Sequence, residues 1–155
     1  MPKTKSLMGK SLAILCLATV SLGFLSSAHA ESSPQIILTT SADTAAVGGE
    51  LKVRIKGVQL EDVYANEINL IYDSTKLRFN GAVSDLSGGF TVSPISNGNV
   101  LQLAHTSVGN KPGVSGDKDL FTLSFTGIAA GTADIGLDTI TLVDSQLNSS
   151  DAPGG

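Results

Sequence analysis

Hydrophobic and polar residues alternate along short stretches of this chain, and the alternation is clearest between residues 64 and 79. One alternating set is Ile68, Leu70 and Tyr72, and the other is Glu67, Asn69 and Ile71. A period of two places successive side chains on opposite faces of a β-strand. The pattern therefore predicts a strand whose first set is buried. A polar turn over residues 73–76 follows, after which Leu77 and Phe79 resume the alternation.

The same pattern recurs along the chain between segments rich in Gly, Pro, Asn and Ser. It predicts further strands at residues 35–40, 50–56, 77–83, 90–95, 100–108, 120–128, 132–137 and 139–143. Asn97-Gly98 predicts a hairpin turn, because both residue types tolerate positive φ. Pro94 donates no backbone hydrogen bond, so it predicts a sheet edge or a bulge. Gly136 predicts a bulge, and Gly57 predicts the end of a strand. Residues 109–119 predict a long loop.

No window after residue 30 shows a helical period. About nine short strands separated by turn residues predict an all-β fold, specifically a jelly-roll β-sandwich. We expect one such domain over residues 31–148. Residues 149–155 are polar and end in Pro-Gly-Gly, so we expect a polar tail or the start of a linker there.

The first 30 residues have the pattern of a secretory signal peptide. Three lysines lie within the first ten residues, an uncharged apolar run covers residues 12–25, and Ala28-His29-Ala30 is a small-x-small cleavage site. The apolar run is too short for a membrane span. We therefore expect cleavage after Ala30, no transmembrane segment in the mature chain, and a secreted, extracellular protein.

Charge and cysteine content narrow the class of the mature chain. Three of the ten basic residues precede residue 31, which leaves seven basic against fourteen acidic residues. An acidic domain of this kind is a poor match for nucleic acid or an anionic membrane. The one cysteine, Cys16, lies in the expected signal peptide, so no disulfide is expected to support the domain.

Groups that could perform catalysis are few. His105 is the one histidine after residue 30, and it shares the alternation of Leu101 and Leu103. A hydrogen-bonded histidine in or near the core explains it better than a catalytic one. The acidic pairs Glu61-Asp62 and Asp117/Asp119 have no matching acid or base partner. We therefore expect a protein that is not an enzyme.

Calcium and carbohydrate are the two candidate ligands. Asp117 and Asp119 flank Lys118 in a Gly-rich stretch, and no EF-hand pattern is present. We expect no cofactor and no metal site, with calcium as the weaker alternative. Sugar platforms use exposed aromatic faces; the chain has no Trp, and only Tyr64 is expected to be exposed. A flat polysaccharide platform is therefore disfavoured, whereas a loop-based sugar site stays open.

Several segments, in order, resemble cohesin domains, the receptor modules that bind dockerins in cellulosomes and related surface assemblies. The resemblance covers about residues 35–145. Its segments are AVGGE at residues 46–50, YANEINLIYDSTKLRF at 64–79, LQLAHTS at 101–107, LFTLSFTG at 120–127 and Ala130-Gly131. It implies a nine-stranded jelly roll. It also implies a dockerin-binding sheet face built from the strands at residues 65–72, 101–107 and 120–127.

The resemblance also implies which residues contact a partner. Glu67 matches an acidic contact position of the family, and Ala65 stands where many cohesins carry Asn. On the second strand Gln102, Ala104, Thr106 and Ser107 match contact positions, and Gln102 and Thr106 make the face more polar than usual. Asn69 lies in the same outward set as Glu67. The expected partner-binding residues are Glu67, Asn69, Gln102, Ala104, Thr106 and Ser107.

The sequence thus predicts a secreted, non-catalytic, cohesin-like module. Its expected role is binding a protein partner, with a dockerin-bearing protein as the candidate, within extracellular polysaccharide degradation or cell-surface assembly. One alternative is a carbohydrate-binding or surface-adhesion β-sandwich of the same superfamily, with polysaccharide as its ligand. A further alternative is an accessory domain of an enzyme.

Overall fold

The computed structural model describes residues 33–154, and these form eight β-strands and no helix. Within this range no helix could span a membrane. The strands are β1 (Gln35–Thr40), β2 (Glu50–Tyr72), β3 (Leu77–Ser84), β4 (Phe90–Asn97), β5 (Val100–Thr106), β6 (Val114–Gly127), β7 (Ile135–Asp144) and β8 (Ser149–Asp151). The expected signal peptide, residues 1–30, lies outside the described residues.

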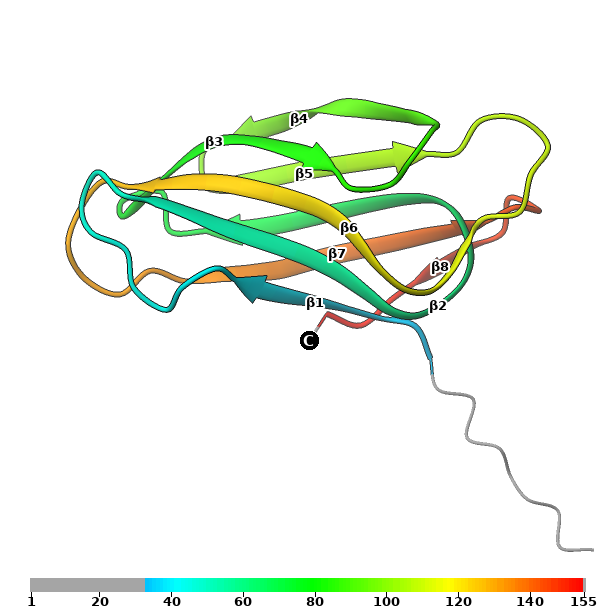
Figure 1. Cartoon of the computed structure of the whole chain (residues 1–155), viewed down its shortest axis with the longest axis horizontal. Helices are drawn as coiled ribbons and strands as arrows, with labels where there is room; N and C mark the ends of the chain where they lie inside the picture. The colour runs from blue at the N-terminus through cyan, green and yellow to red at the C-terminus, as the bar shows by residue number, and fades with distance from the viewer. Residues whose placement is uncertain (1–32, 155) are drawn as a thin grey trace, which may run out of the picture. The chain divides into compact units, whose positions relative to one another are not determined.

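β2 organises the fold, because it takes part in two sets of strand pairs. Its first half pairs with β1 and β6, and its second half, from Val63 onward, pairs with β5 and β7. β3 extends the first set beside β6, and β4 and β8 extend the second beside β5 and β7. In Figure 1, β2 crosses the molecule, turns and runs back. One hydrogen-bonded sheet thus folds into the two layers of a jelly-roll sandwich, as the sequence predicted.

The core lies between these layers and follows the predicted alternation. Leu70 and Tyr72 are buried on β2, together with Leu103, Phe121, Leu123 and Phe125 of β5 and β6. The rings of Tyr72 and Phe125 contact with centroids 5.3 Å apart. Asp73 then closes the predicted turn, where its carboxylate accepts the backbone N–H and the hydroxyl of Thr75. The strand that the sequence predicted most clearly therefore has the predicted inward face.

The expectation that Gly57 ends a strand is wrong, since β2 continues through it. A Cβ at Gly57 would lie 2.5 Å from Cδ1 of Leu60, so the glycine is needed for close packing against that buried side chain. The register with β6 shifts between residues 55 and 63, and Gln59 and Asp62 have positive φ. Two predicted strands are therefore one strand with a bent middle.

The loop expected over residues 109–119 is only partly a loop, because β6 begins at Val114. Two of its side chains bond the bend of β2. Ser115 Oγ accepts the backbone N–H of Asp62 at 2.9 Å, and Asp117 Oδ1 accepts that of Gln59 at 3.0 Å. These contacts connect residues far apart in sequence, so a local pattern of Gly and Pro did not reveal the strand.

The end of the chain also differs from expectation. Residues 149–151, expected to begin a tail or linker, form β8 against β7. Beyond them, Ala152 N–H donates to Ile140 and the carbonyl of Pro153 accepts from Ile36. The two strands expected at 132–137 and 139–143 are one strand, β7, whose register shifts beside Asp138 rather than at Gly136. Backbone hydrogen bonds with β7 and with the start of β1 thus hold these polar residues in place.

The predicted hairpin and edge are present. β4 and β5 are joined at Gly98 and Asn99, and Gly98 alone of the pair has positive φ. That arrangement fits a two-residue turn with glycine in the first central position. The register of β4 against β5 shifts around Pro94, and β4 is the last strand on its side of the sheet.

Candidate partner-binding face

The outward side chains of four neighbouring strands form one continuous surface, which we call the four-strand face. The strands lie in the order β4, β5, second half of β2, β7. Successive cross-strand rows run through Ala65, Glu67 and Asn69 of β2, Thr106, Ala104 and Gln102 of β5, Phe90, Val92 and Ile95 of β4, and Val143, Thr141 and Thr139 of β7. Five of the six expected contact residues therefore share this face.

Ser107 is the exception. It follows the last residue of β5, out of phase with Ala104 and Thr106 in the strand alternation. Its backbone N–H donates to the carbonyl of Tyr64 at 2.7 Å, and its own carbonyl accepts the Thr106 hydroxyl at 3.0 Å. Ser107 thus closes the end of the strand, outside the rows of the face.

Hydrogen bonds hold the polar centre of the face in place. Glu67 Oε1 accepts Nε2 of Gln102 at 2.8 Å, and Nδ2 of Asn69 lies 3.5 Å from the same oxygen. Asn69 also donates to Thr139 Oγ1 at 2.7 Å, which connects β2 to β7. The carboxylate of Glu67 is therefore oriented by neutral amides. Because no cation neutralises it within this network, it can accept a donor from a partner.

The β4 side of the face is apolar. Phe90, Val92 and Ile95 are exposed by 62%, 41% and 54%, in the rows of Thr106, Ala104 and Gln102. Exposed apolar side chains beside small and polar ones are typical of protein-binding surfaces. These three residues were not predicted from the sequence to contact a partner. Their own alternation was the available signal, but it does not reveal which strand β4 pairs with.

Charge is distributed unevenly over the described part of the chain. Its seven lysines and arginines lie on the first half of β2, in the turn between β2 and β3, on β3, on β6 and in the loop before β6. None lies on the strands of the four-strand face, whereas Glu67 is at its centre and Asp138 and Asp151 are at its rim. The face therefore presents negative charge without a compensating cation.

The cohesin resemblance implied that the strand at residues 120–127 belongs to the binding face, and this expectation is wrong. The strand at residues 120–127 is part of β6, which pairs with β3 and the first half of β2 in the other layer. The strand beside residues 65–72 is β7, which contributes Thr139 and Thr141 instead. Thr139, Thr141 and Val143 alternate with buried Ile140 and Leu142, so their outward direction could be predicted from the sequence. The pairing of β7 with β2 could not be predicted, because local alternation does not reveal the order of strands in a sheet.

His105 lies on the buried side of this layer, as its alternation predicted, and only 5% of it is exposed. Its Nδ1 is 2.8 Å from the Thr91 hydroxyl of β4 and 3.2 Å from the Ser84 hydroxyl of β3. Burial lowers the pKa of His105, the positive charge of Lys111 lowers it further, and a hydrogen bond to the Gly88 backbone opposes both. The imidazole is therefore neutral at pH 7 and holds two strands together.

Asp117 and Asp119, the candidate calcium ligands, form ion pairs with basic residues of β2. Asp119 pairs with Arg54 at 3.4 Å, and Asp117 pairs with Lys56 at 3.3 Å. Within residues 33–154, no group of three or more His, Cys, Asp or Glu side chains is arranged to hold a metal ion. Both ion pairs join β2 to β6 at the surface.

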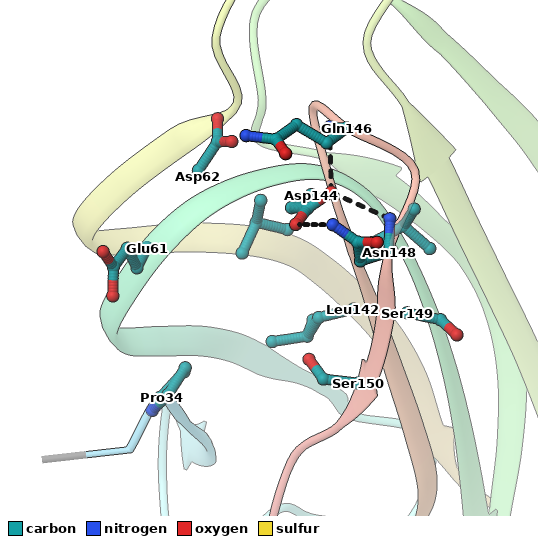
Figure 2. A pocket seen from close by; sticks show the side chains of 11 residues that line it. Pro34, Glu61, Asp62, Leu142, Asp144, Gln146, Asn148, Ser149 and Ser150 are labelled. Atoms are coloured by element: carbon teal, nitrogen blue, oxygen red, sulfur yellow. Dashed lines mark hydrogen bonds between the residues drawn. The ribbon is translucent and has the colours of Figure 1, made fainter. Parts of the chain in front are cut away.

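A hollow of about 400 Å³ lies between the bend of β2 and the β7–β8 turn, with Glu61, Asp62 and Asp144 at its wall. Figure 2 shows Asp144 turned toward the turn that follows it, where it accepts hydrogen bonds from Gln146 and Asn148. These donors lower the pKa of Asp144, the amide side chain of Asn148 having the largest effect. Asp144 therefore shapes a turn.

The jelly-roll sandwich thus presents a sheet face of mixed polar and apolar side chains, as binding modules do. The family model for the cohesin domain matches residues 36–152. The chain therefore belongs to the cohesin domain family, and cohesin modules are non-catalytic binding domains. No curated protein matches this chain.

Solved structures support the same fold. A chain of a type II cohesin-X-dockerin complex from Acetivibrio cellulolyticus has a TM-score of 0.68 at 14% identity, covering 79% of this chain and 94% of its own. The cohesin module of a Clostridium perfringens family 33 glycoside hydrolase has a TM-score of 0.69 at 18% identity, with coverages of 77% and 90%. A non-cellulosomal cohesin from Archaeoglobus fulgidus has a TM-score of 0.66 at 20% identity, covering 79% of this chain and 86% of its own.

Proposed function

We propose that this chain is an exported cohesin that binds a dockerin-bearing protein through its four-strand face, in extracellular polysaccharide degradation or cell-surface assembly. Export is supported by the signal-peptide pattern of residues 1–30. Membership of the cohesin family supports a dockerin as the partner, and similar structures include cohesin–dockerin complexes.

One observation carries the choice of surface. Five residues expected from sequence to contact a partner meet in adjacent rows of one face, around a Glu67 carboxylate that Gln102 orients at 2.8 Å. An oriented carboxylate with no neighbouring cation favours a partner that brings a Lys or Arg. The exposed Phe90, Val92 and Ile95 add apolar area beside it. The matching partner surface therefore combines a basic residue with apolar side chains.

Substitution of Ala104 tests the proposal. This small, half-buried residue lies between Glu67 and Val92 in one cross-strand row. In Ala104→Arg, a long charged side chain would fill the space that a partner needs. We expect binding to weaken by about thirtyfold or more, equivalent to roughly 2 kcal/mol, the loss that marks an interface hot spot. Stability should change by no more than about 0.5 kcal/mol, because the new side chain can extend into solvent.

The measurement is isothermal titration of residues 31–155 with purified dockerin modules from the source organism and from the solved complexes. Gln35→Arg, at the exposed start of β1 in the other layer, is the matched control and should bind as the wild type does. Equal affinities of wild type and Ala104→Arg would place the site elsewhere. Retention on insoluble polysaccharide without any dockerin binding would replace the proposal with the carbohydrate-binding alternative.

A further inference from the structure

His105 lies directly beneath the four-strand face. The neighbouring residues on β5, Ala104 and Thr106, belong to the face, while His105 points inward. Its hydrogen-bond partner Thr91 is likewise flanked on β4 by Phe90 and Val92, which also belong to the face. The His105–Thr91 bond therefore joins the undersides of the two strands that carry the apolar side of the face.

The surroundings of His105 favour the neutral tautomer that carries its proton on Nε2. The backbone group of Gly88 raises the pKa of the imidazole, as a carbonyl that accepts from a ring N–H does. Because Nδ1 faces the hydroxyls of Thr91 and Ser84, Nε2 is the nitrogen on the side of the Gly88 and Gly89 backbone. Nδ1 of the neutral ring then accepts a hydrogen bond, with Thr91 the nearer donor at 2.8 Å.

The attachment of β4 to the rest of the molecule is otherwise slight. β4 is the end strand of its layer, it pairs only with β5 in the described chain, and seven of its eight residues are exposed. The register shift around Pro94 interrupts even that pairing. A bond that ties Thr91 to a buried side chain therefore has a large share in fixing where Phe90 and Val92 lie.

We propose that His105 is a positioning residue for partner binding, whose neutral imidazole holds edge strand β4 in the four-strand face and whose protonation releases it. The inference rests on the proposed function of that face. Protonation would turn Nδ1 from an acceptor into a donor, so that the Thr91 hydroxyl loses the acceptor of its own proton. It would also place a positive charge in a buried site, which favours opening of β4 and the Gly88-Gly89 loop.

The charged groups around the imidazole do not offset that cost. The side chains that face it from β2, β3 and β4 are Asn66, Ser84 and Thr91, which are all uncharged. Lys111, in the loop after β5, adds positive potential. Asp85 follows Ser84 on the other layer, but its carboxylate accepts the Thr122 hydroxyl at 2.8 Å. An imidazolium at this place would therefore lack a carboxylate partner among the described residues.

Hydrogen exchange of residues 31–155 tests the positioning role without any partner. In the wild type, protection of the β4 amides should fall severalfold relative to those of β2 when the pH is lowered from 7.5 to 5. His105→Asn keeps a side-chain acceptor that cannot gain a charge, so its β4 protection should not depend on pH. Thr91→Val should lower β4 protection already at pH 7.5, whereas Ser84→Ala, at the longer contact on β3, should change it less.

The second measurement compares the pH profiles of dockerin affinity for wild type and His105→Asn, using a dockerin that the wild type binds at pH 7.5. Titration of the dockerin is common to both profiles, so their difference isolates His105, the one histidine after residue 30. We expect the wild type to lose affinity more steeply below pH 6.5. Equal slopes, or equal loss of protection over β2 and β4, would overturn the inference. Absence of dockerin binding at pH 7.5 would reject the proposed function alone.

Discussion

Asn66 and His105 lie opposite each other on β2 and β5, both with inward-facing side chains, yet their surroundings differ. His105 has hydrogen-bond partners on two strands, whereas Asn66 is 3% exposed and neither Oδ1 nor Nδ2 has a partner among the described residues. A buried amide without partners lowers stability by about 1–3 kcal/mol relative to a satisfied one. The polar side chain of Asn66 therefore lowers the stability of the folded state.

Replacing Asn66 with Leu, which has a similar shape, should raise the free energy of unfolding by about 1–3 kcal/mol, because the desolvation cost of the amide disappears. Asn66→Asp should lower it at pH 7, because a carboxylate would be buried opposite an imidazole that is neutral at that pH. Urea denaturation of the two variants and the wild type measures both changes. A loss of stability in Asn66→Leu would show that the amide has a polar partner in solution.

For single residues, the sequence predicted well which side chains point inward or outward, but it predicted their hydrogen-bond partners poorly. The burial of Leu70 and Tyr72 and the exposure of Glu67 follow from a local period of two. The inward placement of His105 was predicted for the same reason. Its partners Thr91 and Ser84 were not, because they come from strands whose positions depend on the whole topology.

Among the elements, the bend of β2 shows how side chains join two predicted strands into one. The carboxylate of Asp62 accepts the Gly113 N–H at 2.6 Å and the N–H and hydroxyl of Ser145 at 3.2 and 2.6 Å. Gly113 must be a glycine here, since a Cβ would lie 2.4 Å from the Val63 backbone. One carboxylate thus fastens the bend to the start of β6 and to the β7–β8 turn.

These donors give stability a defined dependence on pH. The hydrogen bond from the Ser145 hydroxyl, followed by that from Gly113, lowers the pKa of Asp62 below its ordinary value of 3.8. Because the folded-state pKa is the lower one, the stabilisation is present above pH 3.8 and is lost as the pH falls through the folded value.

Asp62→Ala should therefore lower the melting temperature at pH 7 and reduce the fall in melting temperature between pH 4 and 2. Differential scanning calorimetry across pH 2–7 measures both effects. Asp43→Asn, in the exposed loop before β2, is the control and should melt as the wild type does at pH 7. An unchanged profile for Asp62→Ala would mean that the bend holds without its carboxylate.

The strand order of the four-strand face marks the limit of prediction at the level of elements. Local alternation located strands in residues 65–72, 101–107 and 139–143, and on the first two it predicted the outward direction of Glu67 and Ala104. Which strand lies beside which is decided by the crossing of β2 between layers, a non-local property. For that reason Thr139 and Thr141 were not predicted to share a face with Glu67 and Ala104, whose two strands the resemblance did pair.

In the molecule as a whole, β2 belongs to both layers and therefore couples their stability. Ile55 in its first half and Ile68 and Leu70 in its second are all fully buried in one core. The first half pairs with β6 and the second with β5 and β7, so neither layer can separate without breaking hydrogen bonds of the same strand. A fold connected in this way has no independent half.

We therefore expect residues 31–155 to unfold in a single transition, with equal calorimetric and van't Hoff enthalpies. Ile55→Ala, in the layer away from the four-strand face, should cost roughly 2–5 kcal/mol through the cavity it leaves. Because the layers share β2, this loss should appear equally in the slowest-exchanging amides of β5 and of β6, measured by hydrogen exchange in the native state. Loss of protection confined to β6 would show that the layers open separately, and that the four-strand face does not depend on the opposite layer for its support.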